Sequence, residues 1–239
     1  MEIIVLSSTQ YKENDLIYNA ISETEYFSFK ASRALKANSA IVWLNNPLTV
    51  ADIELSTDKR YTHPVLKEAK FVSSSMEDNN KVDYFFSIGV IADIATSVLP
   101  DEEKHLLYRD IKDSLSAIKK GKNEQMVLLI LLARAIRFAG SQLEVDKCVF
   151  CGATKDIVSF SFVDGGFICR NCLDSSDHKA ELTPNQMKLV RYAFKSPDYS
   201  CVGIEKYPLE DRVAVLCCFK EFIKDDLGVN LKSVDMFLK

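Results

Sequence analysis

Glycine is absent from this chain until Gly89, and the 239 residues contain only 8 glycines and 6 prolines. No repeat or low-complexity tract is present. Long apolar runs are missing too: the longest, Met126–Ala133, falls far short of the roughly 20 residues that a membrane span needs. No basic stretch precedes the short apolar run Ile3–Leu6, so a secretory signal is not expected. The sequence therefore predicts a soluble, cytoplasmic protein with no membrane partner.

Neither sign of charge dominates, since 30 basic residues face 34 acidic ones for a net charge of −4. No polybasic block indicates a nucleic-acid partner, so any DNA contact must come from a few local Lys and Arg side chains and should weaken steeply with salt. Histidine is scarce as well. The 3 histidines are dispersed, and no serine, cysteine or carboxylate pair has a sequence spacing that indicates a nucleophile with its base. No enzyme is predicted.

The first part of the chain has a β pattern, with β-branched and aromatic residues in short stretches between polar turns. The expected strands are Glu2–Ser7, Leu16–Ile21, Glu25–Lys30, Ser39–Leu44 and Val50–Ser56. Five short strands in this length favour a small barrel or sandwich. The missing glycines disagree with a barrel, because small barrels often use glycine at bulges and tight bends.

A polar linker is expected at Ser73–Lys81, and the apolar period then becomes helical. Three helices are predicted in succession, from Val82 to Leu99, from Asp101 to Gly121, and from Asn123 to Ala139, the last apolar nearly all round. Two more follow the cysteine-rich segment. One starts at Thr183 with a capping box to Gln186, and the other spans Leu209–Leu227.

Cysteine spacing is the strongest signal in the chain. Cys148 and Cys151 form one Cys-x-x-Cys pair, Cys169 and Cys172 form another, and 17 residues lie between the pairs. This spacing is typical of a structural zinc site with four thiolate ligands and no open position for a substrate. The Gly165-Gly166 pair predicts a hairpin tip between the two pairs.

Three alternatives to a metal site are redox pairs, disulfide pairs, and buried thiols that fall at this spacing by chance. An odd total of 7 cysteines in a reducing compartment argues against a disulfide framework. A zinc deaminase would need His-x-Glu upstream of Pro-Cys-x-x-Cys, and neither motif occurs. Cys201, Cys217 and Cys218 have no partner at ligand spacing and are expected to be core thiols.

With these residues assembled, the chain resembles the RecO family of recombinational repair mediators along nearly its full length. The likeness lies in residues 4–22, in the zinc segment at 148–172 with its Phe-Ser-x-x-x-Gly-Gly-Phe hairpin, in the helix at 181–194, and in the tail at 231–239. The zinc segment is the most specific of these stretches.

The resemblance implies an α+β fold: an N-terminal OB-fold barrel, then an α-helical domain with an inserted four-cysteine zinc motif. The expected boundaries are 1–76 for the barrel, 77–145 and 174–239 for the helical parts, and 146–173 for the motif. It also implies a non-enzymatic mediator that binds and anneals single- and double-stranded DNA, acts with RecR, and engages single-strand-binding protein so that the recombinase can load.

The candidate DNA-binding residues are Lys12, Lys30, Arg33 and Lys36. Tyr11, Tyr26 and Phe29 are possible base-stacking platforms if they are exposed. The alternative is that these lysines are solvated surface and these aromatics are core. The loop at residues 30–39 is less basic than is usual in the family, so a second hypothesis is a zinc-stabilised adaptor with little direct DNA binding.

The acidic C-terminal tail of single-strand-binding protein would need an apolar groove rimmed by positive charge. Arg134 and Arg137 suit this chemistry, because guanidinium pairs well with carboxylate. Two alternatives stay open: these arginines mark the exposed edge of their helix, or Lys188 with Arg191 provides the rim.

Overall fold

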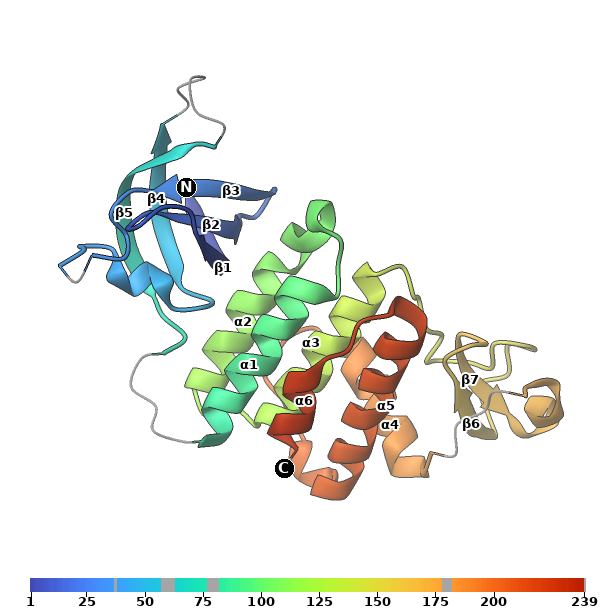
Figure 1. The fold of residues 1–239 in the computed structure, drawn as a ribbon. Coiled ribbons are helices and arrows are strands. Elements are labelled where there is room, and N and C mark those ends of the chain that lie inside the picture. Colours follow the sequence, from blue (N-terminus) through green and yellow to red (C-terminus); the bar gives the residue numbers. More distant parts are fainter. Residues whose placement is uncertain (37, 57–62, 77–81, 178–181, 239) are drawn as a thin grey trace. The chain divides into compact units, whose positions relative to one another are not determined.

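The structure, a computed structural model, describes residues 1–36, 38–56, 63–76, 82–177 and 182–238. These residues form two compact units, Met1–Leu115 and Ser116–Lys239 (Figure 1). The α+β class is confirmed, with a closed five-stranded barrel followed by helices and a small cysteine-bearing hairpin. Among the described residues, no helix has the length and apolar content that crossing a bilayer requires.

The barrel strands are joined in the order β1-β2-β3-β5-β4 and β4 returns to β1, which is the strand order of an OB fold. Neighbours run antiparallel except β3 and β5, which are parallel where Lys30 meets Val65. The strands are β1 Glu2–Gln10, β2 Leu16–Ile21, β3 Tyr26–Ala31, β4 Val50–Ser56 and β5 Val65–Ser73. The four strands predicted at residues 2–7, 16–21, 25–30 and 50–56 are confirmed.

The barrel closes without glycine because its interior mixes large and small side chains. Tyr18 and Phe29 face each other across β2 and β3, and their rings stack with centroids 5.3 Å apart. Alanines make room around them: Ala20, Ala31, Ala34 and Ala51. Extra residues in β1 and β5 shift the register against their partner strands and supply the bends. The left-handed backbone conformation that glycine would normally adopt is carried by Arg33 and Leu48.

The strand predicted at Ser39–Leu44 is wrong, because this segment forms turns and a short 3-10 helix, Val42–Asn45. Ile41 and Trp43 pack against the barrel core and Val42 is exposed, although the segment pairs with no strand. Leu44 enters the barrel core, while the Trp43 indole N–H donates to the carbonyl of Ala40. The fifth strand is β5 instead. It carries several charged residues and no fully buried one, so its period-2 signal was too weak to predict.

From Val82 onward the first unit is mainly helical, with α1, a 3-10 helix and the first turns of α2. The elements are α1 Val82–Ser97, the 3-10 helix Asp101–Leu107 and α2 Tyr108–Lys119. The helices predicted at 82–99 and 101–121 are therefore confirmed, the second with a 3-10 start. The predicted linker at 73–81 begins as the end of β5, and its last residues lie outside the described ones.

The second unit is built around α3, Glu124–Phe138, whose residues Met126–Ala133 are all buried. Asn123 caps it by accepting a hydrogen bond from the backbone N–H of Met126, 3.1 Å away. It packs against α4 and α5, with α6 following. The bounds are α4 Pro184–Lys195, the 3-10 helix Ile204–Lys206, α5 Leu209–Leu227 and α6 Lys232–Phe237. The predicted helices and the capping box of Thr183 with Gln186 are confirmed.

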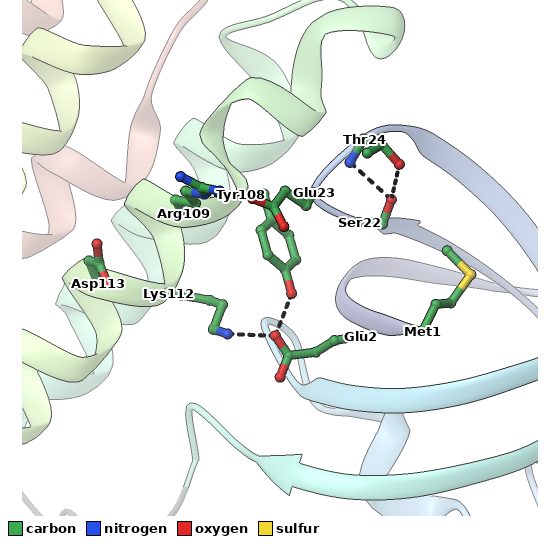
Figure 2. Close-up of a pocket in the computed structure, with 9 residues that line it drawn as sticks. All are labelled: Met1, Glu2, Ser22, Glu23, Thr24, Tyr108, Arg109, Lys112 and Asp113. Atoms are coloured by element: carbon green, nitrogen blue, oxygen red, sulfur yellow. Dashed lines mark hydrogen bonds and ion pairs between the residues drawn. The ribbon is translucent and has the colours of Figure 1, made fainter.

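The barrel is joined to α2 within the first unit by a polar cluster around Glu2 (Figure 2). The Glu2 carboxylate accepts hydrogen bonds from the Tyr108 hydroxyl at 2.6 Å and from the Lys112 ammonium at 2.5 Å. Arg109 pairs with Glu23 beside them. The hydrogen bond from Lys112 is the main reason that the pKa of Glu2 is lowered, so this carboxylate is charged at neutral pH.

We expect Glu2→Gln to lower the free energy of unfolding by about 1 kcal/mol, because a half-exposed carboxylate loses one ion pair and weakens one hydrogen bond. The pKa of Glu2 is lower in the folded chain than its ordinary 4.5. The stabilisation should therefore be complete above that value and vanish as the pH falls through the folded pKa. Urea unfolding at several pH values measures it. Glu25→Gln, at an exposed carboxylate in the neighbouring turn, is the control, and an equal loss there would contradict the assignment.

Candidate functional site

The four cysteines predicted as ligands meet at one point of the second unit. Their sulfur atoms all lie within 4.8 Å of one another. Ligands of a tetrahedral zinc ion, with Zn–S bonds of about 2.3 Å, would be separated by about 3.8 Å. The measured separation between the Sγ atoms of Cys151 and Cys169 is 3.6 Å. The cluster can hold a metal ion, and four thiol donors fit a soft or borderline metal such as zinc.

Local backbone geometry brings each cysteine pair into place. After Cys151 the chain turns at Gly152, which has a left-handed φ of +73°, so that the Cys148 N–H reaches the carbonyl of Ala153 at 2.8 Å. The second pair begins at the end of a hairpin and continues into a 3-10 helix. The elements are β6 Ile157–Ser161, β7 Gly166–Cys169 and the 3-10 helix Arg170–Ser175. The predicted hairpin tip at Gly165-Gly166 is confirmed.

The thiols of the cluster lie close enough to hydrogen-bond to one another. Burial raises the pKa of Cys148, but hydrogen bonds from the backbone N–H groups of Cys169, Cys151 and Phe150 outweigh it and lower the pKa to about 6. A hydrogen bond with the Cys151 side chain raises the pKa of Cys172 to about 12. The backbone therefore already favours a thiolate within the cluster, which is the form that binds metals.

The hairpin is held on the helical body by aromatic packing. Phe162, at the hairpin turn, stacks on Phe222 of α5 with ring centroids 4.5 Å apart, and its edge meets Phe160 at 4.7 Å. Phe160 is fully buried. This packing anchors the turn of the hairpin on α5.

The remaining cysteines lie outside the cluster. Cys201 is buried, and burial raises its pKa to about 11, as expected for a core thiol. Cys218 is only partly buried, and Cys217 is exposed, so the expectation of a core thiol is wrong at Cys217. It lies on the outward face of α5, which an apolar sequence run did not distinguish from the inward one. His178, which follows Cys172 in the sequence, lies outside the described residues.

The candidate DNA-binding residues divide into two kinds on the barrel. Lys30 is ion-paired with Asp15 at 2.9 Å, and both Lys30 and Lys12 lie over the ring of Tyr11, 5.3 and 5.6 Å from its centroid. Arg33 and Lys36 are exposed instead and form no ion pair with any carboxylate among the described residues. These two cations line a surface pocket of about 450 Å³.

A third cation of this pocket, Lys67 of β5, was not predicted, because β5 itself was missed. Lys67 also pairs with Glu54 at 3.1 Å. Of the three aromatic candidates, Tyr11 is exposed and can offer its ring face, Tyr26 is partly buried beneath Lys104, and Phe29 is fully buried. Phe29 is therefore core, and the stacking role suggested for it does not hold.

Arg134 and Arg137 hold the C-terminal end of α4. The Arg134 guanidinium donates to the carbonyls of Ser196 and Pro197, at 2.6 and 3.3 Å, and that of Arg137 donates to the carbonyl of Phe194 at 2.5 Å. These carbonyls would otherwise lack partners at the helix end. Ser196 and Pro197 in turn line a groove along α4.

This groove, which we call the α4 groove, has a volume of about 530 Å³ and combines basic and aromatic walls. Its cations Lys188, Arg191 and Lys195 follow one face of the helix at spacings of three and four residues. The other lining residues are Tyr192, Ser196, Pro197, Asp198, Ser200, Val202 and Tyr207. The alternative pair predicted from sequence, Lys188 with Arg191, is thus brought together in one groove. Lys195 was overlooked, although its spacing to Arg191 is visible in the sequence.

Comparisons with known proteins agree with this architecture. The family description "Recombination protein O C terminal" matches residues 82–235. Proteins named "DNA repair protein RecO" match almost the whole chain: that of Bacillus pumilus is 26% identical over 97% of this chain and 90% of its own length, and that of Caldicellulosiruptor bescii is 25% identical over 98% and 95%. The same protein of Shouchella clausii is 25% identical over 97% of this chain and 91% of its own.

Gly166 tests the geometry of the hairpin. A β-carbon at this residue would lie 2.1 Å from the backbone oxygen of Glu144, so Gly166→Ala must displace that segment and should cost about 3 kcal/mol of unfolding free energy. Gly165→Ala is the matched control, because its β-carbon would meet nothing within 4 Å and only the left-handed φ of +84° is strained, for about 1 kcal/mol. Urea denaturation compares them, and equal losses would contradict the close approach.

Proposed function

Because the chain belongs to the RecO family of DNA repair proteins, we propose that it is a non-enzymatic recombination mediator. In this role it binds single- and double-stranded DNA, anneals complementary strands, acts with RecR, and helps to load the recombinase on strands coated by single-strand-binding protein. The observation that carries the proposal is the full-length similarity to DNA repair proteins in a chain that starts with an OB-ordered barrel.

The DNA would run across the barrel face that carries Arg33 and Lys36. These two cations are exposed, line one pocket and have no carboxylate partner among the described residues, so phosphates can reach them. Tyr11, next to Lys12 in the chain, has an exposed ring. Bases of any DNA sequence can stack on such a ring. Lys30 would contribute less, since Asp15 already neutralises it.

The acidic C-terminal tail of single-strand-binding protein would dock in the α4 groove. Lys188, Arg191 and Lys195 supply charge for its carboxylates, and the tyrosines of the groove supply apolar surface. Arg134 and Arg137, the residues first expected to contact the tail, would support the groove by fixing the end of α4 that forms one wall. We therefore propose that these two arginines position the groove wall and do not contact the tail themselves.

Zinc is the ion that we propose for the four-cysteine cluster, bound by Cys148, Cys151, Cys169 and Cys172. Four thiolates complete its coordination, so it would stabilise the hairpin and leave no position for a substrate. The chain's own contribution is the pair of turns at Gly152 and Gly166 that aim the sulfurs at one point.

A second candidate function is a zinc-stabilised adaptor that holds protein partners and has little direct DNA binding. The net charge of −4 and the neutralised Lys30 favour it. A strand-annealing assay and a gel shift at low salt separate the two functions. Annealing by the purified chain supports the mediator, whereas no annealing together with retained binding to RecR or to single-strand-binding protein supports the adaptor.

Removal of a ligand tests the zinc proposal. Cys148→Ser and Cys169→Ser should each lose the ion and unfold the hairpin, because metal binding contributes on the order of 10 kcal/mol to the folding of such sites. Metal analysis and amide hydrogen exchange of residues 148–172 measure both effects. Cys201→Ser, at a buried thiol outside the cluster, should keep its zinc. A full complement of zinc in either ligand variant would contradict the site.

Loss of two barrel cations tests the DNA face. The double variant Arg33→Gln, Lys36→Gln should weaken binding of single-stranded DNA and reduce the slope of log affinity against log salt by about 1.4, since each phosphate contact on a single strand contributes about 0.7. The control, Lys120→Gln with Lys232→Gln, removes the same charge from exposed positions of the second unit. An equal loss in the control would show that only net charge matters.

A further inference from the structure

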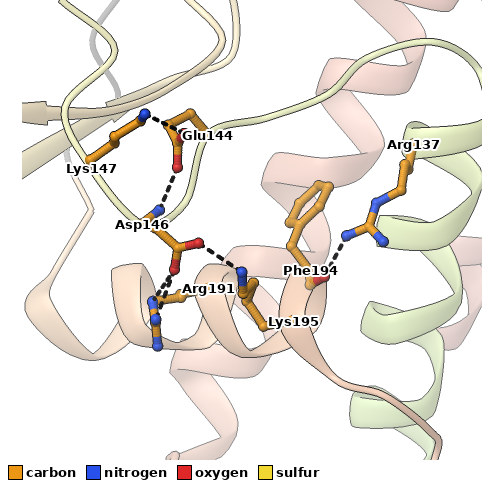
Figure 3. A network of polar contacts seen from close by, with 7 residues as sticks. All are labelled: Arg137, Glu144, Asp146, Lys147, Arg191, Phe194 and Lys195. Carbon is orange, nitrogen blue, oxygen red and sulfur yellow. Dashed lines mark hydrogen bonds and ion pairs between the residues drawn. The ribbon is translucent and has the colours of Figure 1, made fainter. Parts of the chain in front are cut away.

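The cations of the α4 groove already hold a carboxylate that belongs to the chain itself (Figure 3). Asp146 Oδ1 accepts hydrogen bonds from Arg191 Nη2 at 2.7 Å and from Arg191 Nε at 3.1 Å. Its other oxygen lies 2.7 Å from Lys195 Nζ. Both oxygens of Asp146 are therefore used in the way that a carboxylate of a docked peptide would be.

This contact is open to exchange. The side chains of Asp146, Arg191 and Lys195 are 42%, 55% and 51% exposed. Ion pairs that water can reach contribute little net stability, so another carboxylate can replace one of them at small cost. Asp198, the acidic residue that lines the groove, accepts a hydrogen bond from the backbone N–H of Ser200 at 2.8 Å and forms no ion pair with these cations in the described part of the chain. Lys188 forms no ion pair within the described part of the chain.

Asp146 also connects the groove to the metal cluster. It stands two residues before Cys148, and its backbone N–H donates to the Glu144 carboxylate at 2.9 Å. The backbone of Glu144 is bonded to the hairpin: its N–H donates to the Gly165 carbonyl at 2.7 Å, and its carbonyl accepts from Phe167 at 2.9 Å. Residues 144–147 thus form a connection between the hairpin and α4, and the Asp146 side chain of this connection binds two of the cations that line the groove.

We propose that Asp146 is an internal competitor for acidic peptides: it occupies Arg191 and Lys195 while the groove is empty, and a docking acidic tail displaces it. Binding in the groove then frees the connection at residues 144–147, next to the metal ligands. The hairpin itself stays attached, because Phe162 remains stacked on Phe222. This inference rests on the proposed docking of an acidic tail in the α4 groove and adds its regulation.

The test measures the affinity of a fluorescein-labelled peptide, nine residues long, with four aspartates followed by two apolar residues and a free C-terminus. Asp146→Asn should bind it about threefold to fivefold more tightly than the natural chain, because the peptide no longer has to displace an exposed ion pair. In an Arg191→Gln, Lys195→Gln background, binding should be weaker and Asp146→Asn should bring no gain. Zinc content is measured in each variant, so that loss of the hairpin is recognised.

Glu144→Gln is the matched control. It lies in the same connection, but its carboxylate contacts the Asp146 backbone and Lys147 rather than the cations of the groove, so it should not tighten peptide binding. In the natural chain, saturating peptide should speed amide hydrogen exchange at Asp146 and Lys147, and in Asp146→Asn this exchange should be fast without peptide, whereas the Glu144 amide, bonded to the Gly165 carbonyl, should stay protected.

The outcomes separate this inference from the docking on which it rests. Equal or weaker peptide affinity in Asp146→Asn, with zinc retained, would overturn the competition and leave the docking intact. If neither the natural chain nor the variant binds the acidic peptide, both proposals fall. A control peptide with asparagine at each aspartate position should bind to neither protein. If it bound as tightly as the aspartate peptide, charge would not determine binding in the groove, and the competition by Asp146 would be overturned.

Discussion

The cysteine-bearing hairpin of the second unit is organised around four sulfur atoms that lie close enough together to hold a metal ion. They come from two short segments with a hairpin between them, and their atoms lie within 4.8 Å of one another. Such a small hairpin has little core of its own, so the thiol cluster and the packing of Phe162 against Phe219 and Phe222 of α5 hold it. Gly166 makes the arrangement possible, because any side chain there would collide with Glu144.

Several basic side chains in this unit are bound to groups of the chain itself. Arg134 and Arg137 bind carbonyls at the end of α4, while Arg191 and Lys195 bind Asp146. A count of charges therefore overstates what is free to bind a partner. The same holds on the barrel, where Lys30 is neutralised by Asp15 and only part of the basic set remains for phosphates. Availability for binding is decided by these pairings rather than by the net charge.

Some features were predictable because their causes are local. Cysteine spacing identified the four cysteines that cluster, the capping box identified the start of α4, and apolar content with helical start and stop signals identified the main helices. The barrel class followed from short β-like stretches. Residues 39–44 were mistaken for a strand because their apolar content resembles one, although the Trp43 indole bonds locally and the segment forms turns and a 3-10 helix. The strand β5 was missed because its charged residues hide the alternation of apolar and polar residues that marks a strand.

Most of the secondary-structure elements, the four clustered cysteines and the family could be predicted from the sequence alone, because each depends on the type and spacing of residues that are close in the chain. Folding settled which strand closes the barrel, which cations are already paired, and how Asp146 meets α4, because these contacts join residues far apart in the chain. The Asp146 pairing with Arg191 spans 45 positions and leaves no periodic trace. Long-range electrostatic contacts depend on where folding places two side chains, and a pattern that is read along the chain cannot contain them.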